Sequence, residues 1–143
     1  MSKRKVAVHP KEPDFQEVAD QAARNSLEWI REEVAALNAA IAADDDAVRE
    51  DAERTIHEGP LSVEVRSDWH IPGAEDSRAG EYNILLGTGG PASRIIGTLS
   101  EYGEPESAHF EYQDWFKPWT RARLSGEEED VLLKYAQCFY FGE

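Results

Sequence analysis

Apolar residues recur at three- and four-residue spacing along the first third of the chain, which is the period of an amphipathic helix. Asp14 stands just before this repeat, where an aspartate caps a helix N-terminus. The repeat consists of Phe15, Val18, Ala22, Trp29, Ile30, Val34, Leu37 and Ile41. We therefore expect a long helix that begins after Asp14 and buries one face.

The run Asp44-Asp45-Asp46 interrupts this repeat, and aspartates are favourable at the start of a second helix. Apolar residues then return every four positions, at Val48, Ala52 and Ile56, until Gly59-Pro60 stops the chain. Residues 14–58 are thus expected to form a helical part. It is either a hairpin of two helices or one helix kinked near Asp44.

From Leu61 the period of the pattern changes to two, as in a half-buried strand. Leu61, Val63, Val65 and Trp69 alternate with Ser62, Glu64, Arg66 and Asp68. Three more strand-like stretches follow at 81–87, 93–100 and 107–115, with turn residues between them. A helix against one face of this sheet would bury Leu61, Val63 and Val65.

Ser125 and Glu128 form a capping-box pattern, and Val131, Leu132, Tyr135 and Phe139 give the helix after it an apolar face. The fold class expected is α+β: an N-terminal helical pair, a four-stranded antiparallel β meander and a C-terminal helix. Residues 1–13 are expected to be a flexible arm and 14–143 a single domain. Within it, 14–58 is helical, 61–115 is the sheet and 125–140 is the last helix.

The stretch GTGGP, at 87–91, raises the alternative of a phosphate-binding enzyme. A P-loop requires a helix after the glycines and a GK[ST] ending, and its phosphate lies at the helix N-terminus. Here the segment RIIGTL follows, whose β-branched residues favour a strand. We therefore interpret GTGGP as a hairpin turn.

The single cysteine, Cys138, fits a reducing compartment, and no apolar run approaches the roughly 20 residues of a membrane span. The first residues lack the apolar core of a secretory signal. These features predict a cytoplasmic protein.

Charge is the strongest global feature: 29 acidic residues stand against 15 basic ones, for a net charge of −14. Such a surface repels nucleic acid and attracts proteins with basic, nucleic-acid-binding surfaces. The patches expected to bind such a partner are Asp44, Asp45, Asp46, Glu50 and Asp51, and Glu127, Glu128, Glu129 and Asp130. Each patch begins a helix, so capping accounts for part of it.

Neither a metal site nor a catalytic centre is predicted. The four histidines lie in unrelated elements, without the spacing of metal ligands, and Cys138 has no evident base. We expect no cofactor and no enzymatic activity.

Aromatic residues cluster before and within the last helix. Trp115 and Trp119 are the candidate partner-binding aromatics, because exposed tryptophans often anchor interfaces. In the other interpretation, the ending CFYFG packs onto the sheet around DWFKPW. An exposed sheet face would also fit a homodimer.

The segment from Leu61 to Thr120 contains LSVEVRSDW, EYNILLGTGGPASRIIGTLSEYGEPESA and EYQDWFKPWT, and the chain ends in CFYFGE. Together these resemble a group of small acidic proteins of bacteriophages and proteobacterial mobile elements. The resemblance covers about half the chain, leaves out 14–58 and carries no active site. It implies a context in which small acidic proteins antagonise host machinery, as anti-CRISPR proteins and other DNA mimics do.

The first hypothesis is therefore an anti-CRISPR-like inhibitor of a host nucleic-acid-handling defence system. It would act by acidic-surface binding or DNA mimicry inside the bacterial host, and would not bind nucleic acid directly. The alternative is a non-enzymatic accessory interaction module, homodimeric, whose acidity serves solubility. An enzyme that uses the GTGGP loop is the third hypothesis.

Overall fold

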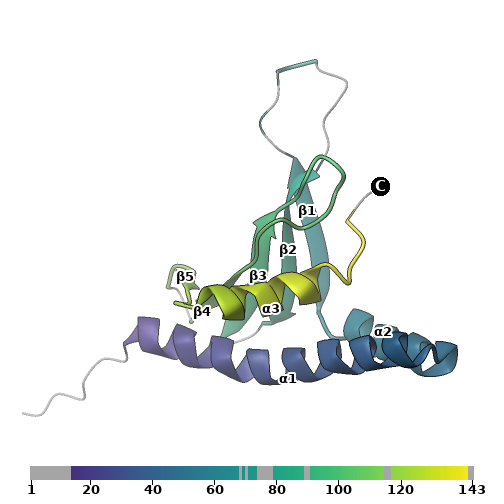
Figure 1. Ribbon diagram of the computed structural model, residues 1–143. Coiled ribbons are helices and arrows are strands. Elements are labelled where there is room, and N and C mark those ends of the chain that lie inside the picture. Colours follow the sequence, from purple (N-terminus) through teal and green to yellow (C-terminus); the bar gives the residue numbers. More distant parts are fainter. Residues whose placement is uncertain are drawn as a thin grey trace, which may run out of the picture.

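In the part of the chain that the structure describes, two helices, five strands and a third helix follow one another (Figure 1). The structure is a computed structural model that describes residues 14–67, 69, 71–73, 79–88, 91–114 and 117–141. The helices are α1 (Phe15–Ala43), α2 (Asp46–Glu58) and α3 (Gly126–Ala136). The strands are β1 (Ser62–Ser67), β2 (Ala79–Gly87), β3 (Ala92–Thr98), β4 (His109–Gln113) and β5 (Thr120–Arg121). The fold class is α+β, as expected.

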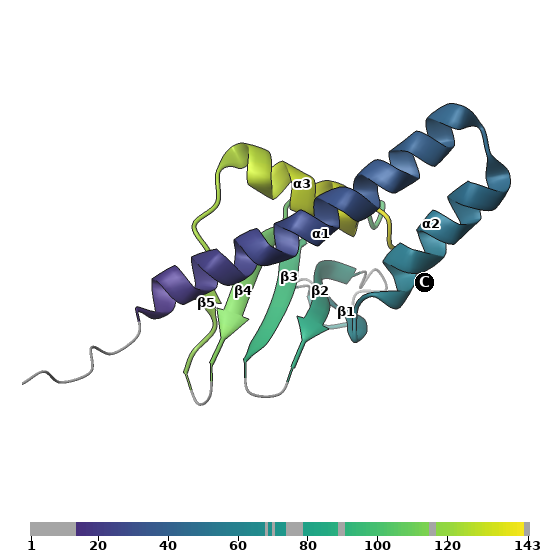
Figure 2. The ribbon, with the colours of Figure 1, turned by 90° about the horizontal axis from the view of Figure 1, so that it is seen from below.

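Helix α1 begins at the predicted cap, where Asp14 Oδ1 accepts hydrogen bonds from the N–H groups of Gln16 at 3.0 Å and Glu17 at 3.4 Å. Its buried face consists of Ala19, Asp20, Ala23, Leu27, Ile30, Leu37 and Ala40. The chain then reverses into α2, which packs beside α1 (Figure 2). The helical part is thus a hairpin and not one kinked helix.

The five strands form one antiparallel meander in the order β1-β2-β3-β4-β5. The prediction of four strands was one short. Pro118 made the segment 116–124 look irregular in the sequence, but Thr120 pairs with Tyr112 and Arg121 with Glu111. A two-residue strand is too short to show an alternating pattern. The strand predicted at 107–115 is also shorter, His109–Gln113.

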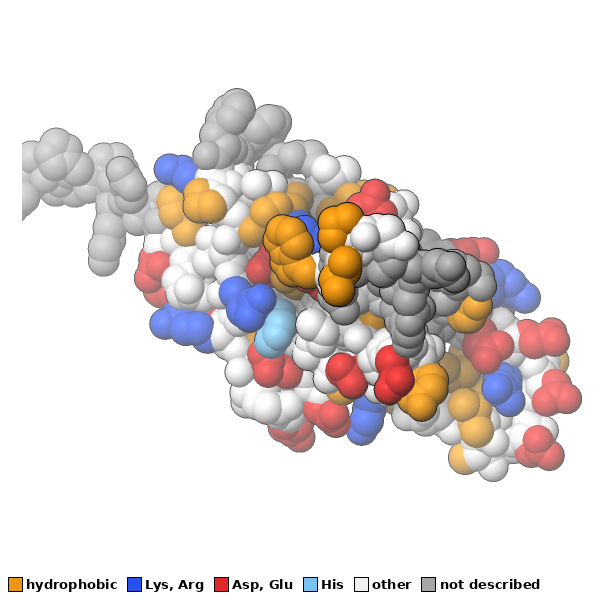
Figure 3. All heavy atoms as spheres, turned by 90° about the horizontal axis from the view of Figure 1, so that it is seen from above, with side chains coloured by type: hydrophobic (Ala, Val, Ile, Leu, Met, Phe, Trp, Pro, Cys, Tyr) orange, Lys and Arg blue, Asp and Glu red, His pale blue; other side chains and the backbone are white. Residues whose placement is uncertain are grey.

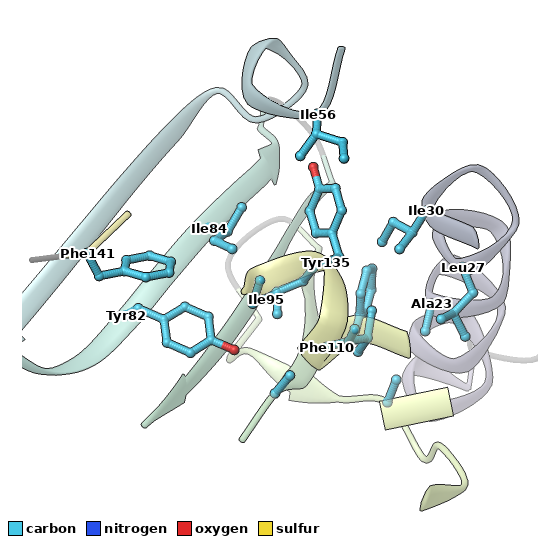
Figure 4. Packing of buried hydrophobic residues seen from close by; sticks show 14 of the residues in the cluster. Ala23, Leu27, Ile30, Ile56, Tyr82, Ile84, Ile95, Phe110, Tyr135 and Phe141 are labelled. Carbon is cyan, nitrogen blue, oxygen red and sulfur yellow. The ribbon is translucent and has the colours of Figure 1, made fainter. Parts of the chain in front are cut away.

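The core lies between α1, α3 and one face of the sheet (Figure 4). Phe110, Ile95 and Ile84 face each other across β4, β3 and β2 in register, and all three are fully buried. Tyr135 of α3 fills the space above them, and its ring meets Trp29 edge-on with centroids 5.7 Å apart. The helix layer therefore covers the middle strands of the sheet.

The aromatic C-terminal segment packs onto this same side. The rings of Phe141 and Tyr82 lie 4.9 Å apart, and Phe139 contacts Tyr135 at 5.3 Å. Tyr140, in contrast, is exposed. Phe139 and Phe141 therefore complete the core over β2, as expected if the ending packs onto the sheet. They do not pack around Trp119 of DWFKPW, because Trp119 lies on the opposite face of the sheet, against Arg94.

Strand β1 contradicts the prediction that Leu61, Val63 and Val65 are buried. Val63 lies opposite Ile84 in the register, on the side of the sheet that carries the helices. The three side chains are nevertheless 59%, 39% and 47% exposed. The cause is the position of β1 at the sheet edge, beyond the cover of α1 and α3. Ile41 and Val48, expected on the dry faces of the helices, are also exposed, because they lie near the turn between α1 and α2, away from the sheet.

The GTGGP stretch connects two antiparallel neighbours, β2 and β3, so it is a hairpin connection as predicted. Gly89 and Gly90 themselves lie outside the described residues. Strand β3 begins directly afterwards, at Ala92. A strand therefore follows the turn, as predicted, where a P-loop would require a helix N-terminus.

A buried carboxylate ties α1 to the segment after β5. Asp20 Oδ1 accepts a hydrogen bond from the Arg123 backbone N–H at 2.7 Å, and Oδ2 accepts one from Arg123 Nε at 2.8 Å. Gln16 Nε2 donates to Asp20 Oδ1 at 3.0 Å. Burial opposes ionisation of this carboxyl, but the hydrogen bonds from Arg123 and Gln16 outweigh it and hold the pKa of Asp20 below its usual value.

Asp20→Asn should lower the free energy of unfolding at neutral pH by about 2 kcal/mol, because charge-assisted hydrogen bonds to a buried group are lost. The folded-state pKa of Asp20 is depressed, so its stabilisation is present above the unfolded-state pKa and disappears as pH falls through the folded value. Denaturant unfolding should show the wild type losing this advantage below about pH 4. The matched control is Asp130→Asn, which removes an exposed pair with Lys134 worth less than about 0.5 kcal/mol.

Gly97→Ala should destabilise the fold by about 3 kcal/mol. A methyl group at Gly97 would overlap the Ser107 carbonyl and stand 2.8 Å from the Tyr82 ring, while Tyr82 Oη donates to that same carbonyl at 2.7 Å. In the control, Gly126→Ala, the added methyl meets nothing within 4 Å, and stability should change by less than about 0.5 kcal/mol. Equal midpoints of the two variants in urea would contradict this account.

Candidate functional site

The connection between α1 and α2 is built from the three aspartates singled out in the sequence. Asp44 ends α1 in the left-handed region, with φ 56°, and its N–H donates to the carbonyls of Ala40 and Ile41. Asp45 caps α2 by accepting a hydrogen bond from the Val48 N–H at 3.2 Å. Asp46 lies in the first turn of α2, where the helix dipole favours a negative charge. The local fold thus explains why aspartates stand here.

All of residues 41–51 are exposed, and we call this segment the hairpin tip. It projects beyond the sheet at the end of the molecule opposite the start of α3 (Figure 2). Acidic side chains gather at this end in the space-filling view (Figure 3). The tip includes all five members of the first predicted patch: Asp44, Asp45, Asp46, Glu50 and Asp51.

The arginines of α2 are engaged by carboxylates of the same helix. Arg49 Nε lies 3.3 Å from Glu53 Oε2, and Arg54 Nη1 lies 2.8 Å from Asp51 Oδ1. Because these pairs neutralise each other, the remaining charge at the tip comes from Asp44, Asp45, Asp46 and Glu50. The tip therefore presents a net negative surface.

In the second predicted patch, at the start of α3, most of the acidic side chains form hydrogen bonds or ion pairs with other residues of the chain. Glu128 completes the predicted capping box: its Oε1 accepts a hydrogen bond from the Ser125 N–H at 2.9 Å, and its own N–H donates to Ser125 Oγ at 3.1 Å. Glu129 Oε2 lies 3.2 Å from His109 Nδ1, and Asp130 pairs with Lys134 at 3.2 Å. Glu127 is exposed. The two acidic patches lie at opposite ends of the helix layer and do not form one surface (Figure 2).

Trp119 lies on the sheet face that the helices leave uncovered, which we call the open face. The Arg94 guanidinium stands 3.9 Å from the centre of its ring and donates two hydrogen bonds, of 2.9 and 2.6 Å, to Glu111 Oε1. Arg121 approaches the other oxygen of Glu111 at 3.7 Å. Trp119 is thus half-buried in an ion-pair cluster that the sequence did not reveal. Trp115 lies outside the described residues.

The open face also contains a hollow of about 260 Å³ between β1, β2 and β3. Its polar lining comes from Glu64, Arg66, Glu81, Asn83 and Arg94, with Ile96 beside them. Asn83 Oδ1 is buried there without a hydrogen-bond partner among the described residues. Both arginines already pair with glutamates, Arg66 with Glu81 and Arg94 with Glu111. The hollow therefore offers no concentrated charge of either sign.

The described residues hold no group of three or more His, Cys, Asp or Glu side chains that could bind a metal ion. Cys138 is half-buried, and its Sγ donates to the Lys134 carbonyl at 3.4 Å. Burial, with a contribution from Glu53, raises the pKa of this thiol, which keeps it protonated at neutral pH.

Within the part of the chain that the structure describes, no helix has the length and apolar character needed to cross a membrane. Comparison with models of known protein families, with curated proteins and with solved structures found no match to this chain.

Substitutions at Asp45 can separate the two ways in which this residue stabilises the protein, helix capping and charge. Asp45→Ala should lower stability by about 1 kcal/mol, because the Val48 N–H loses its acceptor. Asp45→Asn keeps an acceptor oxygen and should be near-neutral in a urea or thermal melt. If both substitutions lower the stability by the same amount, Asp45 stabilises the protein through its charge and not through capping.

Proposed function

We propose that this protein binds the basic nucleic-acid-binding surface of another protein through its hairpin tip and so keeps nucleic acid from that surface. In the context that the resemblance implies, the partner is a nucleic-acid-handling defence system of a bacterial host, met in its cytoplasm. The protein would then act as an anti-CRISPR-like inhibitor without enzymatic activity.

The observation that carries this proposal is the projection of the exposed acidic tip beyond the sheet. Asp46 and Glu50 are one helical turn apart, so their side chains lie on one side of α2, with Cβ atoms roughly 6 Å from each other. Carboxylates on a rigid helix can form ion pairs with lysine and arginine side chains that otherwise neutralise the phosphates of nucleic acid. Such an interaction gains specificity and association rate from complementary charge.

The hairpin tip is a better candidate than the start of α3. At α3, Glu128, Glu129 and Asp130 already have partners within the chain. Binding a partner there would require these contacts to be exchanged, whereas Asp44, Asp46 and Glu50 stay in solvent. The alternative function, an accessory module whose acidity only aids solubility, predicts no difference between the two patches.

Competition for nucleic acid tests the proposal. Purified CRISPR effector complexes loaded with labelled target DNA are titrated with the wild-type protein and with a tip variant, Asp44→Asn, Asp45→Asn, Asp46→Asn, Glu50→Gln and Asp51→Asn. We expect the wild type to displace DNA from at least one effector, and the tip variant to need at least about tenfold more protein. Raising the salt concentration should weaken the wild-type effect.

The matched control neutralises the α3 patch: Glu127→Gln, Glu128→Gln, Glu129→Gln and Asp130→Asn. It removes a similar amount of charge and should displace DNA as well as the wild type does. Circular dichroism confirms that each variant is folded. Equal weakening in the two variants, or DNA that stays bound to every effector under excess wild-type protein, would contradict the proposal.

A further inference from the structure

Strand β1 forms one edge of the sheet and carries apolar side chains in solvent. Among the described residues it pairs with β2 alone, and five of its six residues are exposed. Val63 and Val65 lie on the side of the helices but beyond their cover, with Leu61 just before the strand. An exposed edge strand with apolar residues is a template for pairing with another strand.

We propose that two copies of this chain pair through β1, antiparallel about a two-fold axis at Val65, into one continuous sheet. In this arrangement Val65 of one copy lies opposite Val65 of the other. On the same side, Val63 of each copy approaches Ser67 of its mate. Val65 of each copy then contacts Val65 of the other across the axis, with Val63 as its diagonal neighbour on the same face.

The charges of β1 favour this register over pairing about Glu64 or about Arg66. Glu64 and Arg66 stand on the open face, one residue before and one after Val65, with opposite signs. Antiparallel pairing about Val65 sets Glu64 of each copy opposite Arg66 of the other, so two ion pairs form by symmetry. Pairing about Glu64 or about Arg66 would instead place two like charges face to face.

Arg66 has donors to spare for this contact. It donates to Glu81 Oε1 from Nε at 2.9 Å and from Nη2 at 2.6 Å, while its side chain stays 77% exposed. A guanidinium has five N–H donors, so three remain after these two bonds. Glu64 of the second copy can therefore join the pair without breaking it.

The antiparallel arrangement also separates the two acidic hairpins. Helix α2 leads into β1 through residues 59–61, so it lies at the start of the strand. Antiparallel pairing puts the start of one β1 beside the end of the other, which places the two α2 helices at opposite ends. Six residues of strand span roughly 20 Å, about two Debye lengths at physiological salt. This dimer does not depend on the function proposed for the hairpin tip.

Light scattering on size-exclusion fractions tests the dimer. We expect the wild type to show about twice the 16.1 kDa of one chain at high concentration. In the proposed register, Glu64→Arg sets arginines of the two copies face to face, and Arg66→Glu does the same with glutamates. Each reversal should raise the dissociation constant at least about tenfold. The control Glu50→Arg makes the same change of charge as Glu64→Arg but lies on α2, so it should leave the dissociation constant of the dimer unchanged.

Mixing the two reversed variants gives the sharpest result. The Glu64→Arg chain has arginine at both 64 and 66, and the Arg66→Glu chain has glutamate at both. In a mixed dimer each arginine therefore lies opposite a glutamate, and both ion pairs form again. We expect the mixture to reach the dimer mass at concentrations where each variant alone is monomeric. A wild type that is monomeric up to millimolar concentration would overturn the proposal. So would a Glu64→Arg variant that dimerises as the wild type does, or a mixture that stays monomeric.

Circular dichroism checks that each reversed variant is folded. Should either fail to fold, Val65→Lys, which sets two lysines face to face on the axis, takes its place. Val65→Lys is then expected to be monomeric, and a dimer as tight as that of the wild type would overturn the proposal.

Discussion

Helix α1 packs against Tyr135 of α3 and Phe110 of β4, and the other elements are arranged around this contact. A meander cannot bury its face alone, and it needs a helix layer against one side. Ile30 and Leu27 provide this layer from α1, and both are fully buried. Because α1 is longer than the sheet is wide, its second half and α2 extend past the covered strands (Figure 2). The same geometry leaves the hairpin tip and the edge strand β1 in solvent.

The sequence predicts the parts of this fold that depend on neighbouring residues. The Ser125 and Glu128 capping box needs only four consecutive positions, and both of its hydrogen bonds are present. The bond between Asp20 and Arg123 joins residues far apart in the chain, so no local pattern could reveal it. The exposure of Val63 has a similar origin, because alternation shows which residues share a face but not whether a helix covers that face.

For the candidate site, too, the sequence predicted the local features but not those that depend on contacts between distant residues. The aspartate run identified the hairpin tip, since charge can be read directly from the sequence. Whether two acidic patches meet depends on the path of the chain, and here the α1–α2 turn and the start of α3 lie at opposite ends of the helix layer (Figure 2). The cluster of Trp119, Arg94 and Glu111 required the sheet register, which places these residues on one face.

The core holds the hairpin tip in place, but the tip is not part of the core. Native-state hydrogen exchange at low denaturant separates the two regions, because it measures the opening free energy of each amide. We expect amides of 27–37 and of β3 to exchange only through global unfolding, and those of 46–51 to exchange through a local opening of lower free energy. If the tip and the core exchange with the same free energy and the same denaturant dependence, the tip belongs to the cooperative core, contrary to this expectation.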